Sequence, residues 1–182
     1  TRNACKLCTP LGACLAFKGV RGAVPFMHGS QGCSTYIQRY MISHFKEPID
    51  IASSNFSENT AVFGGGRNLH TGLDNIALQY EPEIVGVMTT CLSETIGDDV
   101  GALIKEYRAA RAGRALPELV SVSTPSYSGT HAEGFADTVQ ALVEQLHQAG
   151  PKRQRINLFP GMLSPADLRY LKEILEDMGL QY

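Results

Sequence analysis

The chain has 182 residues, enough for one complete domain and the beginning of another. Its 16 lysines and arginines nearly balance its 18 aspartates and glutamates, for a net charge of −2, so we expect no nucleic-acid partner. No apolar run approaches the ~20 residues of a membrane span, and the first residues lack the pattern of a signal peptide. These features predict a soluble, cytoplasmic protein with no membrane contact.

Short apolar runs alternate with amphipathic stretches along the chain. The runs that we predict to be buried strands are Ala23–Met27, Ile49–Ala52, Ile84–Thr89, Leu119–Ser123 and Arg155–Phe159. Apolar residues at helical spacing follow the strands, at Leu69, Leu73, Ile76, Ala77 and Tyr80, then at Val139, Leu142, Val143 and Leu146, then at Leu168, Leu171, Leu175 and Met178. This alternation predicts an α/β fold with a Rossmann-like parallel sheet flanked by helices.

A polar segment interrupts this rhythm near the end of the chain. Gln148–Arg155 contains a proline, a glycine and three basic residues, and a new strand and helix follow it. Ser164 suits the N-cap of that helix, with Pro165 at its first position. We therefore predict that residues 1–149 form one Rossmann-like domain. Residues 151–182 would be the first strand–helix unit of a second, truncated Rossmann-like domain, in a chain that is a fragment of a longer protein.

Five cysteines, an odd number without a secretory signal, favour metal, cluster or catalytic use over a disulfide framework. In a parallel sheet, ligands collect at the carboxyl ends of the strands. Cys33 follows the first predicted strand, Cys91 follows the third, and Ser126 follows the fourth. Cys8 precedes the first predicted helix. A helix start stabilises a thiolate, the form of cysteine that binds an iron–sulfur cluster.

The two remaining cysteines differ from these three. Cys14 lies within an apolar helix face, which predicts a core residue. Cys5 forms a Cys-x-x-Cys pair with Cys8, and its role stays open. A structural zinc site usually has two such local pairs, and only one is present, so an iron–sulfur cluster is favoured over zinc. Three dispersed thiolates leave a cluster incompletely ligated, which indicates a partner that supplies the rest.

Other polar groups near these loops have simpler interpretations. Gly64–Gly66 lacks the lysine of a phosphate-binding loop, which favours a tight turn. Among the five histidines, His28 is the candidate for a hydrogen bond or a proton relay at the cluster edge. Glu94, Asp98 and Asp99 are predicted to favour a helix start and solvent. The motifs of hydrolases and dinucleotide-dependent dehydrogenases are absent, and we predict no catalytic residue.

Several motifs in order closely resemble the nitrogenase component 1 family. They are CTPLGA at Cys8–Ala13, HGSQGC at His28–Cys33, HFKEP at His44–Pro48, AVFGG at Ala61–Gly65, TTCLSETIGDD at Thr89–Asp99, and TPSYSGTH at Thr124–His131 followed by Gly134-Phe135. The resemblance covers essentially the whole chain. Members of this family carry three Rossmann-like domains, of which this chain would hold the first and the start of the second.

The resemblance also implies a site and partners. The cysteines matching Cys8, Cys33 and Cys91 hold an iron–sulfur cluster, of 4Fe-4S or P-cluster type, between two homologous subunits. Ser126 matches a serine beside the cluster that acts as a redox-dependent ligand in the catalytic β-subunit. The implied partners are a homologous α-like subunit, in a heterodimer or heterotetramer, and an ATP-dependent iron protein that acts as the reductase.

Two kinds of family member fit the residues. One is the β-like chain of the scaffold that assembles the iron–molybdenum cofactor (the NifN chain of the NifE/NifN type), with an electron-relay role and no substrate chemistry of its own. The other is the β-subunit of nitrogenase itself, an oxidoreductase that reduces dinitrogen. The amino-acid sequences of the segments Cys5–Gly12 and Ile51–Ser54 favour the scaffold. Although the presence of all three cysteines together with Ser126 fits nitrogenase, we predict the scaffold chain, with the β-subunit of nitrogenase as the alternative.

Overall fold

A computed structural model describes residues 6–148, 150–151, 154–160 and 163–182. The chain divides into two compact units, Thr1–Leu146 and His147–Tyr182, and each is described by itself. Cys5 lies outside the described residues. No helix in the described part of the chain is long and apolar enough to cross a membrane.

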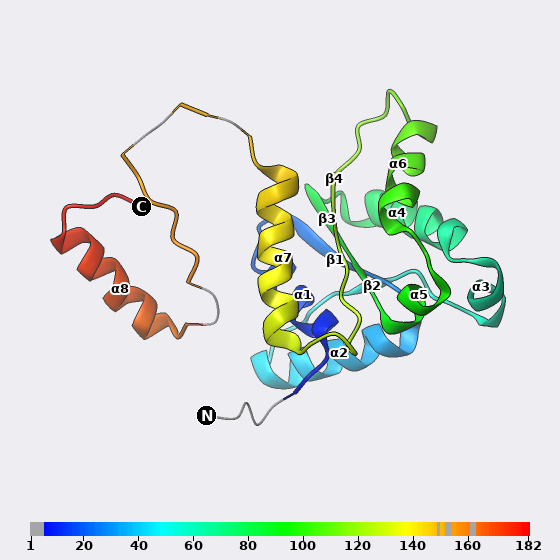
Figure 1. The fold of residues 1–182 in the computed structure, drawn as a ribbon, viewed down its shortest axis with the longest axis horizontal. Helices are drawn as coiled ribbons and strands as arrows, with labels where there is room; N and C mark the ends of the chain where they lie inside the picture. The colour runs from blue at the N-terminus through cyan, green and yellow to red at the C-terminus, as the bar shows by residue number, and fades with distance from the viewer. Residues whose placement is uncertain (1–5, 149, 152–153, 161–162) are drawn as a thin grey trace. The chain divides into compact units, whose positions relative to one another are not determined.

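The first unit is built on a four-stranded parallel sheet (Figure 1). Its strands are β1 (Ala23–His28), β2 (Ala52–Ser53), β3 (Ile84–Thr89) and β4 (Glu118–Val122), in the order β2-β1-β3-β4. The chain therefore leaves β1 in one direction along the sheet and builds β3 and β4 in the other. Such a reversal opens a crevice at the carboxyl ends of the two middle strands, where ligands bind in doubly wound sheets.

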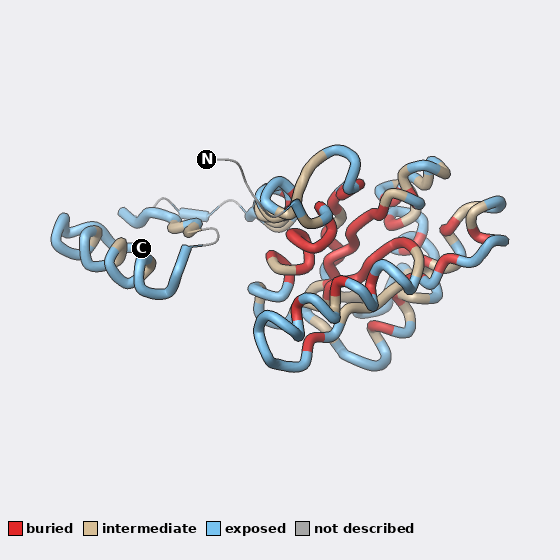
Figure 2. The backbone as a smooth tube through the Cα atoms, turned by 90° about the horizontal axis from the view of Figure 1, so that it is seen from below, coloured by how far each residue is buried: buried red, intermediate tan, exposed pale blue. Residues whose placement is uncertain are grey.

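Helices cover both faces of this sheet (Figure 1). They are α1 (Thr9–Lys18), α2 (Gln31–Phe45), α3 (Glu58–Phe63), α4 (Gly66–Tyr80), α5 (Cys91–Ile96), α6 (Val100–Ala110) and α7 (His131–Leu146). Successive strand residues point to opposite faces: Met27 and Met88 join the core under α1, α2 and α7, whereas Phe26 and Val87 join the core under α4 and α6. Figure 2 shows the buried residues concentrated in the strands and inner helix faces. The predicted α/β fold is confirmed.

Helices α1 and α7 approach each other closely through two glycines. A Cβ atom on Gly12 would lie 1.8 Å from the carbonyl oxygen of His131, and one on Gly134 would lie 2.1 Å from that of Thr9. The buried face of α7 consists of Gly134, Thr138 and Ala141. Of the predicted apolar face, Leu142 and Leu146 pack against the core, whereas Val143 is 45% exposed. Small residues make the closest contact with α1.

Two of the predicted strands differ from the structure. The second predicted strand is shifted: Ile49 is buried in the core, but the hydrogen-bonded strand is only Ala52–Ser53. The predicted strand Arg155–Phe159 is absent from the described residues, where Arg155 makes only an isolated bridge with Gln181. A strand needs a hydrogen-bonded partner along its length. Among the described residues of the second unit, this segment pairs only at that isolated bridge. Tyr80, placed on the buried face of its helix by the pattern, is 40% exposed.

The second unit contains α8 (Pro165–Asp177). The side chain of Ser164 accepts a hydrogen bond from the N–H of Asp167 at 3.1 Å, and Pro165 occupies the first turn, as the sequence predicted. None of the helix residues is buried, and Met178, just after it, is 66% exposed (Figure 2). That this unit opens a second Rossmann-like domain stays a prediction.

Candidate functional site at the carboxyl edge of the sheet

Three thiols lie at the starts of three helices. Cys8 is the N-cap residue of α1, Cys33 lies in the first turn of α2, and Cys91 is the first residue of α5. Helices α2 and α5 follow β1 and β3, the two strands at which the strand order reverses. Cys8 and Cys33 are exposed and Cys91 is partly exposed, and none of them forms a disulfide.

Contacts between α1 and the loop after β4 fix the position of Cys8. The carbonyl oxygen of Leu7 accepts a hydrogen bond from the N–H of His131 at 2.9 Å. The hydroxyl of Thr9 donates to the carbonyl oxygen of Pro125 at 3.2 Å, in a buried position. Both neighbours of Cys8 are thus bonded to the loop that carries Ser126, and the glycine contact between α1 and α7 holds this arrangement.

Cys91 and Ser126 are in direct contact. Their Sγ and Oγ atoms lie 2.7 Å apart, and the N–H of Ser126 also donates to the sulfur at 3.2 Å. A capping box between Thr90 and Ser93 fixes the backbone of Cys91 at the start of α5. The backbone N–H of Ser126 thus donates to the sulfur, and either the hydroxyl or the thiol can be the donor in the second contact.

The three thiols affect one another electrostatically. Partial burial raises the pKa of Cys8, and the nearby Cys33 and Cys91 thiols raise this pKa further by like-charge repulsion. A cationic group bound among the thiolates would remove that repulsion. In the described part of the chain, no three histidine, cysteine or acidic side chains converge as ligands of a single metal ion. Exposed or partly exposed cysteine thiols are the donors that iron–sulfur clusters take.

Cys14 is a core residue, as predicted. It is fully buried in α1, and its thiol contacts the sulfur of Met88 at 3.3 Å. Burial raises the pKa of this thiol far above its ordinary range, so Cys14 stays neutral.

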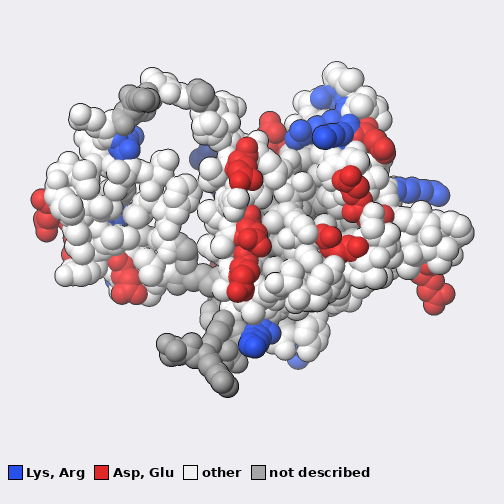
Figure 3. Space-filling model, viewed as in Figure 1, with Lys and Arg blue, Asp and Glu red and all other residues white. Residues whose placement is uncertain are grey.

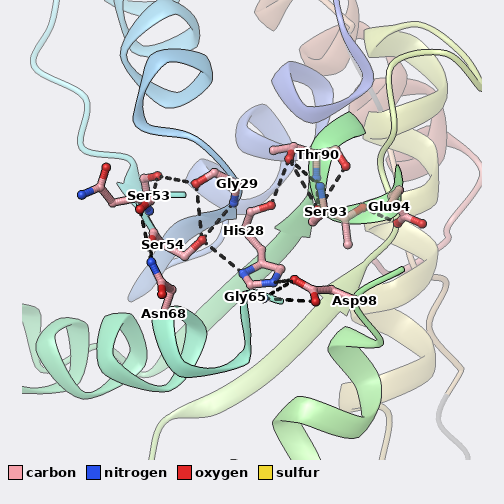
Figure 4. A network of polar contacts seen from close by, with 12 residues as sticks. His28, Gly29, Ser53, Ser54, Gly65, Asn68, Thr90, Ser93, Glu94 and Asp98 are labelled. Atoms are coloured by element: carbon pink, nitrogen blue, oxygen red, sulfur yellow. Dashed lines mark hydrogen bonds and ion pairs between the residues drawn. The ribbon is translucent and has the colours of Figure 1, made fainter. Parts of the chain in front are cut away.

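His28 differs from our expectation of a group at the cluster edge. Its side chain is fully buried, with Nδ1 3.1 Å from the hydroxyl of Ser54 and Nε2 3.0 Å from Asp98 Oδ2 (Figure 4). Its ring also packs edge-on against Phe56. Burial lowers the pKa of His28, and the contact with Asp98 opposes this shift. Both ring nitrogens are thus engaged inside the fold, so a structural role replaces the predicted relay.

The carboxylates near Cys91 also differ from our expectation. Asp98 accepts the His28 contact and the N–H of Gly65, and its side chain is only 10% exposed (Figure 4). Glu94 is bonded to residues of β3 and of the loop after β4. Only Asp99 caps a helix, α6, as predicted, by accepting the N–H of Ala102 at 2.9 Å. The polar partners of Asp98 and Glu94 lie far away in sequence, so a local pattern could not reveal them.

The glycine-rich turn before α4 behaves as expected. Gly64 has a φ of +88°, a left-handed conformation that favours glycine. A Cβ on Gly65 would collide with Phe56 and Asp98.

Acidic and basic side chains are segregated on one face of the molecule. Figure 3 shows acidic side chains along α7, whose exposed residues include Glu133, Asp137 and Glu144, and basic side chains beside α6. This face has no continuous basic surface.

A family model for nitrogenase component 1 type oxidoreductases matches residues 8–182. The chain belongs to this family. It is 42% identical over 184 residues to the nitrogenase molybdenum-iron protein beta chain of Clostridium pasteurianum, covering 99% of this chain and 40% of that protein. It is 40% identical over 183 residues to the beta chain of the same name from Methanococcus maripaludis, covering 96% of this chain and 39% of that one.

Solved structures of the nitrogenase component 1 type agree with the fold. A structure described as nitrogenase Cp1 at pH 6.5 matches with a TM-score of 0.90 and 41% identity, over 100% of this chain and 41% of that chain. A second, nitrogenase Cp1 at pH 5, matches at 20% identity with a TM-score of 0.70, which speaks to the fold alone. The chain thus spans about two fifths of the length of the relatives that it matches.

Proposed function

We propose that this chain is part of the β-subunit of a nitrogenase molybdenum–iron protein, in which Cys8, Cys33 and Cys91 hold an iron–sulfur cluster. The observation that carries this proposal is the gathering of three thiols from separate helix starts at one sheet edge, with a serine on one of the sulfurs. The names of the relatives support the β-subunit over the assembly scaffold that some sequence features favoured.

The chain's own residues would divide the binding work. The thiolates of Cys8 and Cys33 are exposed, and so are open to a cluster at the surface. Cys91 would bind with its sulfur held by the N–H and hydroxyl of Ser126. Three thiolates fall short of the four that an iron–sulfur cluster commonly takes. An α-like subunit would therefore supply the remaining ligands, in a heterodimer or heterotetramer.

When bound, an iron–sulfur cluster supplies one-electron transfer, here between an ATP-dependent iron protein and the metal cofactor of the complex. The sheet edge contributes positioning. The backbone around Cys91 is fixed by a capping box and that around Cys8 by bonds to a neighbouring segment, so these two sulfurs are oriented before the group arrives.

The assembly scaffold is the second candidate, and the sequences of Cys5–Gly12 and Ile51–Ser54 favour it. The two candidates differ in what the complete complex does. The full-length protein is purified with its partner without oxygen, then assayed with the reductase and ATP. Acetylene reduction supports the nitrogenase β-subunit, whereas transfer of a cofactor precursor to apo-nitrogenase supports the scaffold. A complex without iron and acid-labile sulfide would overturn both.

A further inference from the structure

Glu94 links the ends of two neighbouring strands next to the thiol site. Its Oε1 atom accepts a hydrogen bond from the hydroxyl of Thr89, the last residue of β3, at 2.6 Å. The same oxygen accepts a hydrogen bond from the hydroxyl of Ser123, the first residue after β4. Glu94 itself lies in the first turn of α5, so one carboxylate joins three segments of the sheet edge.

The directions of these hydrogen bonds require an acceptor at Glu94. The N–H of Thr124, which can only donate, bonds to the hydroxyl oxygen of Thr89 at 2.7 Å. The hydroxyl of Thr124 donates to the carbonyl oxygen of Thr89, also at 2.7 Å. The hydroxyl hydrogen of Thr89 is therefore free to point at Glu94, and both threonines are buried. Replacing Glu94 with an apolar residue would leave the buried Thr89 hydroxyl without its acceptor.

These contacts lie on both sides of the Cys91–Ser126 pair. Thr89 and Glu94 precede and follow Cys91 in the chain, and Ser123 and Thr124 lead directly to Ser126. The Glu94 carboxylate thus joins the segment that carries Cys91 to the segment that carries Ser126. No contact in the described structure joins Glu94 to a cysteine, so it can act on the sulfur only through these segments.

We propose that Glu94 is a positioning residue that sets the separation of Cys91 and Ser126, and with it the hydrogen bonding of the cluster sulfur. This inference rests on the proposed cluster. Hydrogen bonds to a ligating sulfur tune the reduction potential of an iron–sulfur cluster. Loosening the strand ends would alter these bonds and so shift the potential, while all three thiols remain to hold the iron.

The test uses the full-length protein in complex with its partner, purified without oxygen, with iron analysis, redox titration and EPR. The Glu94→Leu complex should keep its iron. At a fixed applied potential, its ratio of oxidised to reduced cluster should change at least tenfold, which corresponds to a shift of about 59 mV in the reduction potential for one electron. Glu94→Gln keeps an acceptor oxygen and should stay within threefold of the wild type. Glu58→Leu, a matched change at an exposed first-turn glutamate of the equally short α3, should also stay within threefold.

A double variant separates positioning from a general structural effect. Ser126→Ala removes one of the two contacts through which Glu94 acts and leaves the backbone N–H in place, so Glu94→Leu should add a smaller change in that background than in the wild type. A full additional change there, or an unshifted potential in an iron-loaded Glu94→Leu protein, overturns the inference while leaving the proposed cluster intact. A wild-type complex without iron overturns both this inference and the proposed cluster.

If the Glu94→Leu protein fails to fold, Ser123→Ala removes one of the two contacts of Glu94 at an exposed site. It should shift the potential in the same direction by a smaller amount. An unshifted Ser123→Ala then overturns the inference.

Discussion

The carboxyl edge of the sheet holds two polar groups of opposite character. The thiol group, Cys8, Cys33 and Cys91, is exposed or partly exposed and repels itself electrostatically. The histidine group, His28 with Ser54 and Asp98, lies inside the fold with both ring nitrogens bonded (Figure 4). The histidine group is satisfied by hydrogen bonds within the fold, whereas the thiols are open at the surface. If the proposed cluster binds, one group would hold the backbone of this edge and the other would bind the metal.

Removing two of the three thiols should have the largest effect and is the sharpest way to break this comparison. Cys33→Ala together with Cys91→Ala should remove most of the iron from the full-length complex, because a single remaining thiolate from this chain cannot hold a cluster at the interface. Iron and acid-labile sulfide analysis measures the loss. The matched control, Cys14→Ala, should retain its iron, since this thiol is buried among core residues. Unchanged iron in the double variant would contradict the assignment.

The contact between α1 and α7 supports the thiol group, and a side chain on Gly12 should break it. Gly12→Ala would place a Cβ 1.8 Å from a backbone oxygen of His131, so the two helices must separate. We expect the free energy of unfolding to fall by about 3 kcal/mol, as in severe overpacking. Urea denaturation of the purified protein measures this. Gly101→Ala in α6, where the new Cβ meets only the Asp99 side chain at 3.3 Å, should change it by less than ~1 kcal/mol.

The histidine group should matter for stability and not for iron. His28→Leu removes one hydrogen-bond partner from the buried Ser54 hydroxyl and one from the Asp98 carboxylate, and should lower the free energy of unfolding by about 2 kcal/mol. The iron content of the full-length complex, measured beside the denaturation midpoint, should stay within a third of the wild-type value. Loss of iron in a folded His28→Leu protein would place the histidine in the metal site after all.

The same histidine should give the protein a pH dependence. Burial lowers the pKa of His28 in the folded state, so as pH falls the unfolded chain takes up the proton first. Stability should therefore fall as pH drops below ~6.5, the ordinary histidine value, until the folded pKa is reached. Denaturation at several pH values should show this slope in the wild type and a shallower one in His28→Leu. Equal slopes would mean that the other histidines and carboxylates cause the trend.

The sequence predicted the thiol group better than the histidine group, for a physical reason. Cys33 and Cys91 could be placed because strand ends and helix starts are local features, and parallel strands bring their carboxyl ends together. The partners of His28 come from the residue that follows β2 and from the loop between α5 and α6, and no local pattern encodes such contacts. The strand order, which puts β1 beside β3, is likewise a tertiary property.

The fold itself was predictable where burial follows a simple period. Strands β1 and β3 are mostly apolar runs, β4 contains three apolar residues, and α4 buries Leu69, Leu73 and Ile76 at helical spacing. The buried face of α7 was not predictable, because glycine, threonine and alanine carry little hydrophobic signal even when a close helix contact depends on them. The short β2 has too few residues to show a period.

An exposed ion pair on the opposite face of the sheet provides the smallest expected effect and a contrast with His28 and Asp98. Asp74 accepts hydrogen bonds from Arg111 and, at 3.1 Å, from the hydroxyl of Tyr107, and its side chain is 44% exposed. The hydrogen bond from Arg111 lowers the pKa of Asp74 below its usual value of 3.8, and burial together with Asp74 raises the pKa of Tyr107 to about 12.

Because water screens the pair, Asp74→Asn should lower the free energy of unfolding by only about 0.5 kcal/mol near neutral pH. Because folding lowers the pKa of Asp74, the pair contributes its full stabilisation above pH ~4. This stabilisation is lost as the pH falls through the pKa that Asp74 has in the folded protein. Denaturation at pH 7 and pH 3, with and without 1 M salt, should show the difference between wild type and Asp74→Asn shrinking in acid and in salt. If Asp74→Asn lowered the free energy of unfolding as much as His28→Leu, the solvent-screened pair would be as stabilising as the buried one, which would contradict this comparison.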